Sequence, residues 1–320
     1  MQSSASPDQA NQPRLAALLT LSIALISISF APIFIRFSET ELGANATVFN
    51  RFAIFVLCFG SLHWGKQRFS PDAEVETSEP LTLRRGLLLT GVGISSMISL
   101  VLWAMSLQYT TIAKCMLLNN LTPLFTSLGS WLLWKKRFDR RFLIGMAIAL
   151  VGAIALGLED IHGADGFLLG DLYALLSAAF LGIYFLLVEQ LRNWFSATTI
   201  LLWRCVIGSA MLLPVVLFTE RQLFPQTTVA ILAVLGLGLI SEGFGQRLLA
   251  DCLDTLSSSF VALFLLLEPI VSAVLAWFIF MEKLSPATWI GFTIILMGIY
   301  LAQSSQTCNQ TLNSVQTPTA

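Results

Sequence analysis

Ten long runs of apolar residues dominate this 320-residue sequence. A helix needs about 20 apolar residues to cross the hydrocarbon core of a bilayer, whereas barrel strands are about half as long and alternate in polarity. Charged residues make up only 12% of the chain, against about 25% in ordinary soluble domains. The pattern therefore predicts an all-α polytopic membrane protein with ten transmembrane helices. The predicted spans are 15–36, 45–64, 86–107, 111–133, 141–158, 167–188, 196–219, 228–249, 256–280 and 286–303.

The distribution of Lys and Arg predicts the orientation, because cytoplasmic loops of membrane proteins are enriched in both. With the N-terminus inside, twelve of the 18 basic residues fall on the cytoplasmic side, including Lys135 and Arg192. Arg36, Arg221 and Lys283 fall on the opposite side. We expect a multi-pass protein of the plasma (inner) membrane with both termini in the cytoplasm.

The chain contains an internal repeat. Residues 121–156 align without a gap with 267–302, at an offset of 146. Eight pairs are identical, among them Pro123/Pro269, Trp131/Trp277 and Gly152/Gly298. Five spans per copy is an odd number, so the second copy enters the membrane upside down, as in many secondary transporters. The predicted organisation is a polar tail (1–14), a first five-helix repeat (15–158), an acidic loop (159–166), a second repeat (167–303) and a polar tail (304–320).

Each repeat ends in the same pattern of a Pro-containing helix, a turn and a Gly-containing helix. The first copy reads LTPLF…WLLWKKRF…GMAIALVGA, and the second reads LEPIV…WFIFMEKLSPATWIGFTIILMG. This resembles the EamA-type domain of the drug/metabolite transporter superfamily, present twice over about residues 15–303. The resemblance implies ten helices, a central cavity between the halves, and export or exchange of metabolites such as amino acids. The family's usual acidic residue after the fourth and ninth helices is present as Glu282, but Lys136 stands at the matching position of the first half.

Two carboxylates fall inside predicted spans, where a charged side chain costs about 2.5–3.5 kcal/mol on insertion scales. Glu268 precedes Pro269 in the ninth span and could bind a cation or accept a proton. A structural role, in which Glu268 is buried and paired with a neighbouring Lys, Arg or hydroxyl, has equal weight. Glu242 lies among four glycines of the eighth span, which permit either close helix packing, the favoured interpretation, or local unwinding. We treat both as candidate residues of a substrate cavity.

Other polar and aromatic residues of the spans complete the candidate cavity. Asn119 and Asn120 suit hydrogen bonds to a polar substrate. Lys114 could attract a carboxylate or phosphate, although a lysine that snorkels to the interface is slightly favoured. Trp103 and Tyr184 could line the cavity or pack within the bundle.

Four further residues recur in matching pairs. Arg51 and Arg204 lie about two turns inside the second and seventh spans, where inversion would place one near each face. A structural role is favoured for this pair over substrate binding. Pro123 and Pro269 free backbone carbonyls within their helices, which a membrane protein tolerates only where protein or cavity water satisfies them. These four are candidates for structural or gating roles.

The function predicted from these features is secondary transport of a small amino-acid-like or drug-like metabolite, as an exporter working by alternating access. The expected partners are the small-molecule substrate, the lipid bilayer, and a proton or counter-ion as an open possibility. No metal, cofactor, nucleic acid or catalytic residue is expected, because the sequence has neither a Walker motif nor a metal-spaced Cys or His pattern. A membrane-embedded enzyme and a scaffold or sensor without flux remain as alternatives.

Overall fold

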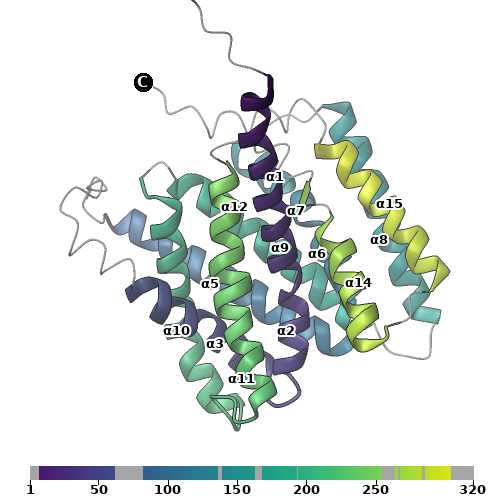
Figure 1. Ribbon diagram of the computed structural model, residues 1–320. Helices are drawn as coiled ribbons and strands as arrows, with labels where there is room; N and C mark the ends of the chain where they lie inside the picture. Colours follow the sequence, from purple (N-terminus) through teal and green to yellow (C-terminus); the bar gives the residue numbers. More distant parts are fainter. Residues whose placement is uncertain are drawn as a thin grey trace, which may run out of the picture.

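The computed structural model describes residues 7–61, 82–135, 139–162, 168–192, 194–253, 264–265, 267–282 and 285–303. Helices account for all the regular secondary structure of these residues, which form one bundle (Figure 1). This confirms the predicted all-α fold. The first half contains α1 (Pro7–Ser29), α2 (Ala31–Ser38), α3 (Ala44–Phe55), η1 (Val56–Gly60), α5 (Leu83–Tyr109), α6 (Ile112–Asn119), α7 (Thr122–Trp134) and α8 (Arg140–His162). The second half contains α9 (Leu168–Leu191), α10 (Ala197–Thr219), α11 (Thr228–Leu235), η2 (Gly236–Gly245), α12 (Gln246–Leu253), α14 (Glu268–Phe280) and α15 (Pro286–Gln303).

Several predicted spans are built from more than one helix. The first span is α1 continued by α2, and the eighth is α11, η2 and α12 in succession. Five helical stretches among the described residues are long and apolar enough to cross a membrane by length and composition: Ala17–Ser38, Leu83–Tyr109, Leu168–Leu191, Thr198–Thr219 and Thr228–Leu249. Shorter apolar helices lie at Ala44–Gly60, Glu268–Phe280 and Trp289–Ala302. The start of the predicted ninth span, 256–263, lies outside the described residues.

The helices begin and end where their sequences dictate. Thr111, Ser196 and Thr227 each accept a hydrogen bond from the backbone N–H three residues later, which caps the first turns of α6, α10 and α11. The third and fourth predicted spans are joined only by the short turn between Tyr109 and Ile112. This short connection keeps the two spans next to each other.

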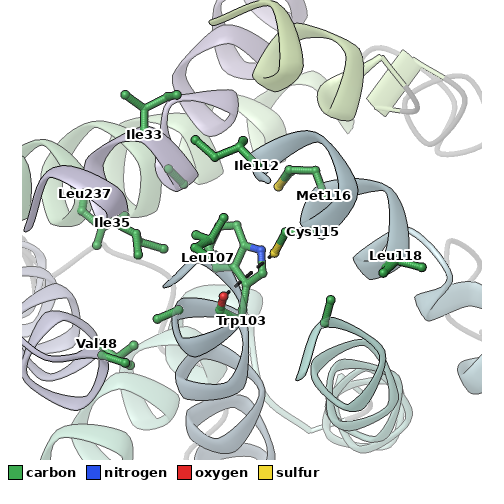
Figure 2. Packing of buried hydrophobic residues seen from close by; sticks show 14 of the residues in the cluster. Ile33, Ile35, Val48, Trp103, Leu107, Ile112, Cys115, Met116, Leu118 and Leu237 are labelled. Carbon is green, nitrogen blue, oxygen red and sulfur yellow. Dashed lines mark hydrogen bonds between the residues drawn. The ribbon is translucent and has the colours of Figure 1, made fainter. Parts of the chain in front are cut away.

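The bundle is apolar both inside and outside. Its main core contains fully buried side chains such as Phe52, Leu107 and Leu117. Figure 2 shows part of this core, where the Trp103 ring packs beside Leu107 and the ring nitrogen faces Cys115. Many large apolar side chains are instead exposed, and Phe218 is 90% exposed. An apolar exterior of this extent requires lipid around it, and the protein is therefore integral to a membrane.

The repeat is visible in the geometry of its helix ends. Lys135 follows α7 and Met281 follows α14, and these residues are 146 positions apart. Both adopt the left-handed conformation, with φ of 52° and 54°. They are the non-glycine residues with positive φ in the described backbone. Two residues with the same strained backbone conformation, separated by the repeat offset of 146 positions, support a duplicated unit.

The last helices of the two halves cross closely. A Cβ at Gly145 of α8 would lie 2.6 Å from the carbonyl oxygen of Gly298 in α15, and a Cβ at Gly298 would lie 2.7 Å from that of Gly145. Only glycine therefore allows the two backbones to approach so closely. This contact joins the two repeats along one side of the bundle, where α8 and α15 lie side by side (Figure 1).

Candidate functional site

A buried cluster of three charged residues joins the two halves of the chain. Arg51 Nε donates a hydrogen bond of 2.8 Å to Glu242 Oε2, and Arg51 Nη2 donates to the same oxygen. Arg204 Nη2 lies 3.0 Å from Glu242 Oε1, although the angles are not those of a hydrogen bond. Each residue is more than nine-tenths buried. We call Arg51, Glu242 and Arg204 the charged cluster.

The charged cluster corrects one prediction. The sequence placed one arginine near each face, but both guanidinium groups reach a single carboxylate. The backbone of α3 and that of α10 enter from opposite ends, and the long arginine side chains extend inward to meet Glu242. A carboxylate between two cations offsets the cost of burying them, which explains why the side chains converge.

Glycines position the helices that carry the cluster. A Cβ at Gly238 of η2 would lie 2.7 Å from Ile54 Cγ2 of α3, and a Cβ at Gly93 of α5 would lie 2.5 Å from Ile207 Cγ2 of α10. Each isoleucine lies three residues after a cluster arginine, so the two contacts are repeat-related. The segment around Glu242 is also a π-helix. The glycines of the eighth span therefore provide both close packing and local unwinding.

Aromatic and hydroxyl side chains surround the arginines. The Arg51 guanidinium carbon lies 5.9 Å from the centroid of the Trp103 ring, and that of Arg204 lies 5.3 Å from the Tyr184 ring. Arg204 Nε also donates a 2.6 Å hydrogen bond to Ser96 Oγ of the first half. Cation–π contacts of this kind stabilise a desolvated guanidinium. The predicted residues Trp103 and Tyr184 thus lie at the charged cluster.

The fourth and ninth spans are both broken at their proline motifs. The helix restarts at Thr122 in α7 and at Glu268 in α14, with a proline in the first turn of each. Half-helices whose first turns face the bundle interior are a common feature of transporter binding sites. Glu268 lies close enough to Arg51 for their charges to interact. It forms no ion pair within the described part of the chain.

The remaining predicted cavity residues lie on α6 and at its C-terminal end. Asn119 Oδ1 accepts a 3.4 Å hydrogen bond from Ser177, whereas Asn120 Nδ2 donates to Met116 O. Asn120 lines a small apolar cavity of about 20 Å³ that also contacts α8 and α15. Lys114 is only 6% exposed in the first turn of α6, so the expectation of a lysine reaching the interface is wrong.

A second polar network, which sequence reasoning missed, ties the halves together at one end of the bundle. Arg36 pairs with Glu282, and Arg36 Nη2 donates to the carbonyl oxygens of Leu107 and Thr110 at 3.0 and 2.9 Å. Glu282 Oε2 also accepts from the backbone N–H of Ile112 at 3.2 Å. We call this end, where α2, α5 and α14 finish, the polar end. The distribution of Lys and Arg predicts that the polar end faces outward. Arg36, a basic residue at the end of the first predicted span, was the sequence signal that could have pointed to this network.

Two further carboxylates cap helices of the opposite half at the polar end. Glu220 accepts from the backbone N–H groups of Asn45 and Ala46 at 2.9 and 3.1 Å, which satisfies the start of α3. Glu41 accepts from those of Gln226 and Thr227 at 2.6 and 3.0 Å, next to the start of α11. Hydrogen bonds from the Thr227 side chain and backbone lower the pKa of the exposed Glu41 carboxyl. These reciprocal caps hold the polar end closed across the two halves.

Glu39 is the titratable group of interest at the polar end. Burial raises the pKa of its carboxyl to about 8 from the usual 4.5, against the opposing effects of a Gln108 hydrogen bond and the Arg36 charge. The nearby charge of Glu220 raises it further. One Glu39 oxygen is buried without a hydrogen-bond partner. Burial therefore raises the pKa of this carboxyl toward the physiological pH range.

Chemically, the charged cluster is suited to binding and orientation. It presents guanidinium donors, a carboxylate and aromatic faces in a region that excludes water, where electrostatic interactions are strong. The residues of the charged cluster come from both halves of the chain.

The chain is similar in sequence to known transporters. The model of the EamA-like transporter family matches residues 15–158 and 168–303. One "Uncharacterized transporter" of Archaeoglobus fulgidus is 26% identical over 90% of this chain and 97% of its own, and another is 26% identical over 66% of each chain. The "GDP-mannose transporter GONST1" of Arabidopsis thaliana is 29% identical over 85 residues, 27% of this chain and 26% of its own.

A solved structure shares the fold, with a TM-score of 0.60 and 18% identity over 90% of this chain and 97% of that one. The family match covers both halves and coincides with the duplicated units found in the sequence. The chain is a membrane transporter and belongs to the EamA-like transporter family.

Proposed function

We propose that this protein is a secondary transporter that exports a small polar metabolite by alternating access about the charged cluster. The observation that carries this proposal is the buried carboxylate of Glu242, which contacts Arg51 of the first repeat and Arg204 of its own repeat. Charged groups buried at membrane depth are costly and mark substrate or ion pathways. A site shared by two repeats is also reshaped whenever the repeats move against each other.

The polar end supports the alternating part of the proposal. Arg36, Glu41, Glu220 and Glu282 all bond to groups of the opposite half, so the polar end acts as a closed gate. The gate opens when these bonds, which are exposed or partly buried, exchange for bonds to water. In the proposed orientation, the protein lies in the plasma membrane with both termini in the cytoplasm and the polar end outside. The conformation with the polar end closed is then closed to the exterior.

Glu268 is the proposed coupling residue. Its carboxylate stands at the break of the ninth span, interacts electrostatically with Arg51, and forms no ion pair among the described residues. It can take up a proton or balance a cationic group of the solute, and either event would change the charge beside the cluster. Solute binding and proton binding are then linked through Arg51.

Flux through proteoliposomes tests this function. Purified protein would be reconstituted with a defined mixture of amino acids, nucleobases and organic acids inside, and efflux measured by mass spectrometry with and without a proton gradient. We expect gradient-dependent efflux of a subset of solutes, and a loss of at least about tenfold with Glu268→Gln at normal expression. The control Glu189→Gln, at the end of α9, should retain flux. Absence of efflux for every solute would contradict transport, and full activity of Glu268→Gln would remove it from coupling.

A further inference from the structure

The charged cluster leaves two strong hydrogen-bond donors unused. Arg51 directs Nε and Nη2 at one oxygen of Glu242, but its Nη1 is buried without a partner. The indole Nε1 of Trp103 is likewise buried without a partner. Both residues are only 6% exposed. A buried donor without an acceptor costs about 1–3 kcal/mol, so two on adjacent side chains call for a common explanation.

The two donors lie in the same part of the bundle. The guanidinium carbon of Arg51 in α3 lies 5.9 Å from the centroid of the Trp103 ring in α5. Figure 2 shows that the ring nitrogen is at the edge that faces α6. A guanidinium above a ring face and an N–H at its edge can together hold one planar acceptor group with two oxygens.

The charge of the cluster defines what that acceptor is. Two arginines and one glutamate sum to one positive charge, so a single negative charge neutralises the cluster. A carboxylate brings one charge and two oxygens, whereas a phosphate monoester brings about −1.5 to −2 at neutral pH. The balance therefore favours a monovalent carboxylate.

We propose that Arg51 Nη1 and Trp103 Nε1 form the recognition site for a carboxylate of the transported solute. This rests on the proposed transport function and deepens it by naming the substrate class. The carboxylate accepts one hydrogen bond from each donor, and the other cluster residues hold Arg51 in place. Glu242 and Arg204 are positioning residues for the arginine.

A binding measurement that does not depend on flux tests the site. Full-length protein in detergent would be heated with 3-phenylpropionate, 3-phenylpropionamide or 2-phenylethyl phosphate at matched ionic strength, and its Tm recorded. We expect the carboxylate to raise the Tm in proportion to its concentration and the amide to have no effect. The same rise with carboxylate and amide, no rise with either, or a larger rise with the phosphate would overturn the carboxylate assignment.

Trp103→Phe is the decisive variant, because it removes the indole N–H and keeps an aromatic ring beside Arg51, although the buried side chain becomes smaller. If Trp103 only packs, the variant loses stability through the smaller ring but keeps its affinity for 3-phenylpropionate. We expect the variant to fold, with an apparent affinity for 3-phenylpropionate about tenfold lower, the effect of one charge-assisted hydrogen bond. The control Trp277→Phe changes an exposed ring and should keep wild-type affinity. Wild-type affinity in Trp103→Phe would overturn the proposal.

The two proposals fail in distinguishable ways. If 3-phenylpropionate binds with the predicted dependence on Trp103 but proteoliposomes release no solute, transport is contradicted and the carboxylate site stands. If solutes are released but those without a carboxylate leave as fast as those with one, the site is contradicted and transport stands.

Discussion

At the scale of single residues, the molecule is organised by charges that it buries. Glu242 is 1% exposed and holds two arginines that would otherwise repel each other at membrane depth. Replacing a whole buried ion pair with apolar residues is often neutral, but removing one partner leaves an uncompensated charge. The cluster is therefore most sensitive to loss of its single anion.

Glu242→Gln tests this dependence. The substitution keeps the shape of the side chain and leaves two buried guanidinium groups without a counter-charge, so we expect a loss of about 3–5 kcal/mol in the free energy of unfolding. Chemical unfolding in detergent, followed by fluorescence, measures it. Arg192→Gln, an exposed control, should change stability by less than about 0.5 kcal/mol. Equal stability of wild type and Glu242→Gln would mean that the anion does not hold the arginines.

Glu39 predicts a pH dependence with a definite sign. Because folding raises the pKa of this carboxyl from 4.5 to about 8, the folded protein binds the proton more tightly than the unfolded chain. This contribution to stability is present below pH 4.5 and is lost as the pH rises toward about 8. The Tm in detergent should fall over that window, and Glu39→Gln should flatten the fall. An unchanged slope in the variant would contradict burial of Glu39.

All three residues of the charged cluster could be identified from the sequence, but their contact with one another could not. Arg51, Arg204, Glu242 and Trp103 each stood out as polar or aromatic residues inside apolar spans. Their meeting could not be predicted, because Arg51 and Glu242 are separated by 191 positions and only packed helices bring them together. The pairing of Arg36 with Glu282 was missed for the same reason, since 246 positions separate them.

At the scale of elements, small residues and helix breaks set the architecture. The prolines were expected to free backbone carbonyls within continuous fourth and ninth spans, whereas the helices restart at these motifs. The glycines of the eighth span allowed two interpretations, and the π-helix shows that both hold. The length of each helix piece was less predictable, because apolar residues continue through the breaks and hydropathy does not register them.

The crossing of α8 and α15 provides a test at this scale. In Gly298→Ala the new Cβ would lie 2.4 Å from the backbone nitrogen of Ala149, so the helices must separate. We expect a loss of about 1–3 kcal/mol in the free energy of unfolding, the usual cost of overpacking. Gly86→Ala is the matched control, because nothing lies within 4 Å of its new Cβ, and it should be neutral or stabilising by up to about 1 kcal/mol. Equal effects of the two substitutions would contradict the close crossing.

At the scale of the whole molecule, the ten-span all-α fold and the duplication were predictable, because hydropathy and the proline, tryptophan and glycine pairs mark them directly. The placement of the two halves relative to each other was not predictable from the sequence, because it depends on contacts between them. The path of α9 beside α6 and α7 illustrates this. Gly170 packs against Thr110, Gly182 against Phe125 and Gly129 against Leu186. These segments therefore run in the same direction and finish at one end, near Lys135 and Arg192.

The repeat-related ends, Lys135 and Met281, lie at opposite ends of this arrangement. Lys135 follows α7, whereas Met281 adjoins Glu282 at the polar end. Both residues are exposed. In a chain built from two oppositely inserted copies, equivalent residues must lie on opposite sides of the membrane.

Side-specific labelling of single cysteines at these positions tests the central claim most directly. Lys135→Cys, Arg192→Cys and Met281→Cys would each be made in a background without native cysteines and exposed to a membrane-impermeant maleimide in intact cells and in inverted vesicles. We predict that Met281→Cys reacts in intact cells, and that Lys135→Cys and Arg192→Cys react only in inverted vesicles. Labelling of Lys135→Cys and Met281→Cys from the same side, or of Lys135→Cys and Arg192→Cys from different sides, would contradict two oppositely inserted repeats and the transport mechanism built on them.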